Sequence, residues 1–160
     1  MALPSEIADI WNSFANSVGG IDETRFYEAF FFADDEESAN ALAELVLSGT
    51  KRATAGAVWA YEAEGKRLAA PGDLSVVTDW AGVPKCIIET VAVEIVPFNL
   101  VTAEFAATEG EGDGSLEYWR GIHRQCFSRE CARHGRRFTE DMPVACERFR
   151  VVFRPAAEST

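Results

Sequence analysis

A single carboxylate interrupts the apolar side of a long predicted strand. Residues 85–96 alternate between two faces, as a pleated strand requires, and Glu89 lies on the more apolar one. A buried carboxylate is costly unless it is paired, hydrogen-bonded or protonated. Glu89 is therefore a candidate functional acid in a cavity. The alternative is a bulge at Thr90 that turns Glu89 out to solvent. The apolar residues of that face are Ile87, Val91, Val93 and Ile95.

Lys51 is the candidate cationic partner of this acid. The chain has only three lysines, and Lys66 lies in a polar stretch while Lys85 opens a predicted strand. Lys51 instead follows the expected helix end at Gly49, in a segment of small residues where backbone can approach closely. The alternative is an exposed charge near the helix C-terminus.

Helices and strands follow one another without regular alternation, which favours an α+β fold. A helix capped by Asp34 and ended by Gly49 precedes Lys51, and the strand that carries Glu89 comes later. The aromatic stretch 24–33 is ambiguous between helix and strand. Further helices are predicted over residues 5–18, 100–107 and 116–134, and strands over 74–78, 85–96 and 144–153.

The net charge of −11 opposes tight, nonspecific binding of long nucleic acids. Residues 116–160 nevertheless carry nine arginines and six acids, so a local arginine surface could hold a nucleotide or a short strand. The alternative is a solvated helix face followed by a strand. No apolar run approaches the ~20 residues needed to span a bilayer, so no membrane partner is expected. Four cysteines without a signal peptide indicate reduced thiols and a cytoplasmic protein.

The run Gly49-Thr50-Lys51-Arg52-Ala53-Thr54 resembles the Gly-x-Lys-x-x-Thr signature of the ASCH domain family. Other stretches, in the same order, resemble a longer bacterial-type branch of that family. The resemblance covers about residues 25–153 of a single expected domain, 1–160. The stretches include Trp59-Ala60-Tyr61-Glu62, Pro71-Gly72-Asp73-Leu74, Ile88-Glu89-Thr90, Glu109-Gly110-Glu111-Gly112-Asp113 and Cys146-Glu147-Arg148-Phe149.

The resemblance implies a small PUA-like β-barrel flanked by helices, with a cleft at one end. It also implies a function related to RNA or nucleosides. Some members resemble amidohydrolases that deacylate N4-acetylcytidine with a Lys, a Thr and a Glu. Lys51 and Thr54 match the first two by motif, and Glu89 matches the third by its place on a strand. The family often has Arg where this chain has Gly56, and the candidate substitutes are Arg52, Arg120 and Arg148.

Two mechanisms remain open for such a site. Lys51 acts as the base for Thr54 if its pKa falls well below the usual ~10.4. Otherwise Glu89 activates water or Thr54, and charged Lys51 stabilises the oxyanion. Catalysis itself is not established by the sequence. The alternatives are a ribonuclease acting on single-stranded RNA and a noncatalytic RNA- or nucleotide-binding module.

Several other residues are candidate substrate contacts. Trp59 and Trp119 could stack on a base, although aromatic residues on helices more often belong to the core. Arg120 and His123 share one helix face. Asp113 and Ser115 precede the same helix, where capping is the alternative role.

Two groups of residues have the ligand types and spacing of candidate metal sites. Glu109, Glu111 and Asp113 alternate along a Gly-rich loop, as ligands of a divalent cation would, but a turn that leads into a capped helix is favoured. The second group cannot converge on one zinc ion if its helix is continuous. No metal and no cofactor is therefore predicted. The members of the second group are His123, Cys126, Cys131 and His134.

Overall fold

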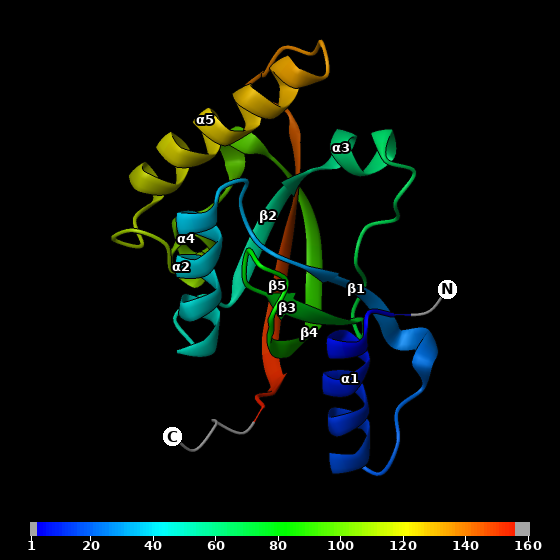
Figure 1. The fold of residues 1–160 in the computed structure, drawn as a ribbon. Coiled ribbons are helices and arrows are strands. Elements are labelled where there is room, and N and C mark those ends of the chain that lie inside the picture. The colour runs from blue at the N-terminus through cyan, green and yellow to red at the C-terminus, as the bar shows by residue number, and fades with distance from the viewer. Residues whose placement is uncertain (1–2, 156–160) are drawn as a thin grey trace.

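The computed structural model describes residues 3–155, which form one five-stranded sheet with helices packed around it (Figure 1). The strand order is β1-β3-β4-β5-β2. Only β1 and β3 pair in parallel, and the other neighbours are antiparallel. This confirms the α+β prediction. The strands are β1 (Phe26–Phe30), β2 (Ala53–Ala57), β3 (Leu74–Thr78), β4 (Pro84–Pro97) and β5 (Pro143–Phe153).

The predicted closed barrel is not confirmed. Within residues 3–155, β1 pairs only with β3 and β2 only with β5, so β1 and β2 remain the two edges of an open sheet. Edge β2 begins two residues after Lys51 and carries Thr54.

Helices α2 and α5 begin at polar caps close to the predicted positions. Asp35, one residue after the expected cap, accepts a hydrogen bond from the Ser38 backbone N–H at the start of α2. Ser115 caps α5 in the same way. No helix in the described part of the chain has the length and apolar character to cross a membrane. The helices are α1 (Ser5–Ser17), α2 (Glu36–Leu47), α3 (Val58–Ala63), α4 (Ala103–Glu109) and α5 (Leu116–Arg133), with short 3₁₀ turns η1 (Glu23–Arg25) and η2 (Phe98–Leu100).

The central strand β4 is covered on both faces along its first half. Ile87 packs against α1, and its neighbour Ile88 packs against α2. Beyond Glu89, β4 has lost β3 as a partner and a bulge follows Thr90. Val91 is consequently 51% exposed, and Ile95 is exposed as well. The single apolar face predicted for β4 therefore does not extend along the strand.

Helix α5 covers the other part of the sheet, near β2 and the first half of β5. Its core residues Trp119 and Phe127 pack around Phe98 of η2. In Figure 1, α5 and α1 lie at opposite ends of the molecule. The loop between α4 and α5 is thereby brought to the start of β2, beside Lys51.

Candidate functional site

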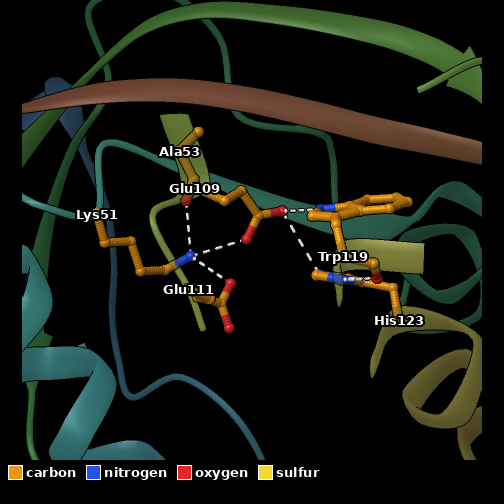
Figure 2. Close-up of polar contacts among 6 residues, drawn as sticks. All are labelled: Lys51, Ala53, Glu109, Glu111, Trp119 and His123. Carbon is orange, nitrogen blue, oxygen red and sulfur yellow. Dashed lines mark hydrogen bonds and ion pairs between the residues drawn. The ribbon is translucent and has the colours of Figure 1, made fainter. Parts of the chain in front are cut away.

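Lys51 is buried and its ammonium group contacts three oxygen atoms (Figure 2). Its Nζ donates to Glu109 Oε2 at 2.9 Å, to Glu111 Oε2 at 3.0 Å and to the Ala53 carbonyl at 2.7 Å. An ammonium group has three donors, so all of them are satisfied. Lys51, Glu109 and Glu111 form what is called here the lysine–glutamate cluster.

Two glycines bring the glutamates to Lys51. Gly110 ends α4 in the left-handed conformation with φ 68°, and a Cβ at this position would lie 2.2 Å from the Thr50 carbonyl oxygen. A Cβ at Gly112 would lie 2.5 Å from the Tyr118 ring. Only glycine permits this backbone and this close approach. The loop therefore lies against the residue before Lys51 and directs both carboxylates at its ammonium group.

A tryptophan holds Glu109 from the other side, and a histidine stacks on that tryptophan. Trp119 Nε1 donates to Glu109 Oε1 at 2.8 Å, and the His123 ring stacks on Trp119 with centroids 4.2 Å apart. His123 Nδ1 lies 2.9 Å from the Trp119 carbonyl oxygen. We assign the proton to Nδ1 because a carbonyl can only accept, which leaves the lone pair of Nε2 facing Glu109 Oε1 at 3.5 Å. Burial lowers the pKa of His123 to about 4, so the ring is neutral at pH 7.

The three ionisable groups of the lysine–glutamate cluster have differently shifted pKa values. Burial opposes the charge of Lys51, but Glu109 and Glu111 outweigh it and hold the pKa of Lys51 above its usual value. Burial likewise disfavours the Glu109 carboxylate, but Lys51 and hydrogen bonds keep its pKa below the usual value. For Glu111, burial and the hydrogen bond with Glu109 raise the pKa to about 7. Glu111 can therefore gain or lose a proton near neutral pH.

The cluster opens onto a cleft of about 620 Å³. Residues of α2, β2, α3 and α5 line it, and Thr54 and His123 are among them. Its apolar wall includes Leu42, Leu45, Tyr61, Tyr118 and Phe127, and charged residues at its border include Asp34, Asp35, Glu64, Lys66, Arg129, Glu130 and Arg133.

Glu109, Glu111 and His123 also have the donor types of a metal site. Their ligand atoms lie within 4.8 Å of one another. The Lys51 ammonium group, however, lies within 3.0 Å of both carboxylates. A metal ion would compete with this resident cation, so the arrangement favours a shared proton over a divalent ion.

The predicted position of Glu89 beside Lys51 or Thr54 is wrong. Its carboxylate binds Arg25 Nη2 at 2.9 Å and Arg150 Nη2 at 2.6 Å, and its side chain is 19% exposed. Glu89 does not line the cleft. Two features explain this position: the strand face that Glu89 shares with Ile87 packs on α1, and η1 brings Arg25 to it.

The other predicted contacts divide into two groups. His123 lines the cleft, and Trp119 acts on it indirectly through Glu109. The remaining four do not line the cleft. Trp59 packs under Arg136, Arg120 donates to the Asn99 carbonyl, Asp113 accepts from the Ser115 N–H, and Ser115 caps α5.

Glu109 and Glu111 were not predicted as partners of Lys51. Their alternation with glycines suggested a cation loop or a simple turn. The helix start at Asp113 and Ser115 is indeed the predicted capped turn. The two glutamates before it instead face inward, onto a lysine far away in the sequence.

Comparisons with known proteins agree with this geometry. The model of the ASCH domain matches residues 28–153. An ASCH domain structure from Lactobacillus crispatus is similar, with a TM-score of 0.87, 37% identity and coverage of 96% of this chain and 98% of that chain. A structure from Enterococcus faecalis has a TM-score of 0.86, 31% identity and coverage of 94% and 90%. Among curated proteins, none matches this chain.

Proposed function

The chain belongs to the ASCH domain family, and from this premise we propose that it hydrolyses a small uncharged amide of the acetylated-nucleoside type. One observation carries the proposal. The cleft contains a carboxyl group with a pKa of about 7, Glu111, in direct contact with a charged lysine, Lys51. An acid–base group that titrates at the working pH and a fixed positive charge are the two components that amide hydrolysis requires.

The charges support the second of the two mechanisms, with Glu111 in the role expected of Glu89. Glu111 takes a proton from the attacking water and returns it to the leaving nitrogen. If Thr54 attacks instead, an acyl-threonine ester forms as the nitrogen leaves, and water deprotonated by Glu111 then hydrolyses this ester and restores the hydroxyl. Lys51 remains charged and stabilises the oxyanion that forms on the amide carbonyl. A Lys51 base is disfavoured because its neighbours raise its pKa.

The lining of the cleft supports an uncharged, planar substrate. Tyr61, Tyr118 and Phe127 offer aromatic surface for a flat ring. Six acids and four bases line the cleft, so a phosphate group would meet net negative charge. This charge favours a nucleoside over a nucleotide or an RNA strand.

The arginines of the C-terminal segment give no support to an RNA surface. Arg124 pairs with Glu140, Arg133 with Asp34, and Arg148 with Glu104. Because acids neutralise these three guanidinium groups, they do not form a free positive surface that would favour the ribonuclease or RNA-module alternatives.

The test is turnover of N4-acetylcytidine, measured by chromatography of the products cytidine and acetate. Glu111→Gln and Lys51→Met should each lower kcat by ~10²-fold or more. Thr54→Ser should retain more activity than Thr54→Ala, because it keeps the hydroxyl. Glu6→Gln, a change of an exposed acid of α1 outside the cleft lining, is the control. No turnover of any acylated nucleoside, together with submicromolar RNA binding at ~0.15 M salt, would reject the proposal.

A further inference from the structure

Three polar side chains form a row across adjacent strands, on a face of the sheet that is otherwise largely apolar. Thr54 of β2 is directly opposite Glu147 of β5 in the strand register. Thr90 of β4 donates its hydroxyl to Glu147 Oε2 at 2.8 Å. Residues directly opposite in an antiparallel pair point to the same side, with Cβ atoms about 4.5–5.5 Å apart. Glu147 therefore stands between the cleft residue Thr54 and the buried residue Thr90.

The bulge in β4 contributes to this row. The register shifts between Thr90 and Ala92, so Glu147 is opposite Val93 and Thr90 reaches it diagonally. Bulges commonly redirect a side chain next to a functional site. Here the result is that one oxygen of Glu147 is held by Thr90.

Glu147 lacks a cationic partner in the described part of the chain, where it forms no ion pair. Lys66 is the cation that favours its ionised form, but Lys66 Nζ is bound to Glu28 at 2.7 Å. Glu28 and Asp73 add negative charge, and Tyr61 also lies close enough to interact. Burial raises the pKa of Glu147, and the Thr90 hydrogen bond partly offsets this. A glutamate in this position needs a further hydrogen-bond donor.

We propose that Glu147 is a positioning residue for Thr54: the Thr54 hydroxyl, which forms no side-chain hydrogen bond within residues 3–155, turns to donate to the second carboxylate oxygen of Glu147, and this bond orients the hydroxyl in the cleft. The inference rests on the proposed function only where it assigns Thr54 to the substrate side of the site. The register of β2 and β5 and the Thr90 anchor bring the two side chains within reach of each other, so this contact would form independently of the reaction.

The first test needs no substrate. The pKa of Glu147 is measured by carboxyl carbon NMR, with its signal identified by its loss in Glu147→Gln. Thr54→Val removes a donor to the charged form, so the pKa should rise by about half a pH unit or more. Thr90→Val should raise it too, whereas Thr78→Val, a buried threonine of β3 that donates to the Asp79 carbonyl, should not. An unchanged pKa in Thr54→Val overturns the proposal.

The second test separates positioning from structural support. Glu147→Gln keeps an oxygen for Thr90, so the fold should survive while kcat falls by ~10-fold with KM unchanged. In a Thr54→Ala background the same change should have no further effect, because Glu147 acts through Thr54. Equal losses in both backgrounds overturn the proposal. A pKa shift without any amide turnover would instead reject the proposed function alone.

Discussion

The ammonium nitrogen of Lys51 lies 2.9 Å from a carboxylate oxygen of Glu109, and each of the two side chains is only 1% exposed. Taking two charges out of water carries a large desolvation penalty, which close contact and additional hydrogen bonds must offset. The Ala53 carbonyl and the Trp119 indole N–H supply such bonds, one on each side of the pair. Stability and the proposed chemistry therefore depend on the same atoms.

Lys51→Met should destabilise the protein by ~3–5 kcal/mol, because it leaves buried Glu109 without its counter-charge. The double variant Lys51→Met, Glu109→Gln should recover much of this loss, since no unpaired charge remains. Lys85→Met is the control, because Lys85 is partly exposed and lies 3.8 Å from Asp79. Urea unfolding measures all three variants. A double variant no more stable than the single one would contradict the ion-pair explanation.

Glu111 should make stability fall as pH rises. Its pKa is about 7 in the folded protein, against a usual value of 4.5. Between these values the folded state holds a proton that the unfolded state has released, so raising the pH favours unfolding. Glu111→Gln lacks this effect. Unfolding free energies at about pH 5 and about pH 8 should therefore drop more in the wild type than in the variant. His123 is present in both proteins, so parallel pH dependences would refute the raised pKa.

Gly110→Ala should disrupt the lysine–glutamate cluster. A Cβ there would meet the Thr50 carbonyl oxygen at 2.2 Å, in addition to the left-handed strain of φ 68°. Gly114→Ala is a matched control, because Gly114 has φ 76° and nothing within 4 Å of its Cβ position. The control measures the cost of the left-handed conformation alone, which should lower the unfolding free energy of Gly114→Ala by ~1–2 kcal/mol. Gly110→Ala should lose clearly more unfolding free energy than Gly114→Ala; equal losses would mean that the close approach to Thr50 is unimportant.

Local patterns singled out Lys51 as a candidate, with an exposed charge as the alternative, but could not predict its burial or its partners. A lysine after a helix end, among small residues, stood out from the other two lysines. Periodicity placed Glu89 on a strand face, but it does not say which element covers that face, and here α1 and Arg25 do. The partners Glu109 and Glu111 depend on how Gly110 packs against Thr50, a contact between distant parts of the chain.

The open sheet was missed for the same reason. Whether β1 and β2 pair with each other depends on long-range geometry, whereas the existence of the long strands follows from local alternation. The capped start of α5 was predictable because Ser115 and Asp113 act on neighbouring backbone N–H groups.

Glu89→Gln should leave amide turnover near the wild-type value, in contrast to Glu111→Gln. Its partners are partly exposed arginines, so stability should fall by no more than ~1 kcal/mol. Kinetics and urea unfolding of the two variants side by side provide the measurement. A loss of turnover in Glu89→Gln as large as that in Glu111→Gln would show that Glu89 takes part in the reaction after all.

Gly56→Ala should weaken substrate binding through Tyr61. The Tyr61 ring lies against the backbone of Gly56, where a Cβ would be 3.0 Å from Tyr61 Cε2 and 3.1 Å from its hydroxyl oxygen. Both residues line the cleft, so a methyl group at 56 pushes the ring toward the space that a substrate ring would use. Contact between an aromatic side chain and a base contributes ~1–3 kcal/mol, so KM should rise by ~5-fold or more with little change in kcat.

Two variants at position 61 separate crowding from loss of the ring. Tyr61→Leu removes the aromatic face and should raise KM as Gly56→Ala does, whereas Tyr61→Phe keeps it and should bind substrate like the wild type. In a Tyr61→Leu background, Gly56→Ala should have little further effect, because the ring it displaces is gone. The KM values of the wild type, Gly56→Ala, Tyr61→Leu and the double variant form a complete double-mutant cycle. A wild-type KM in Tyr61→Leu would show that the substrate does not contact this wall of the cleft.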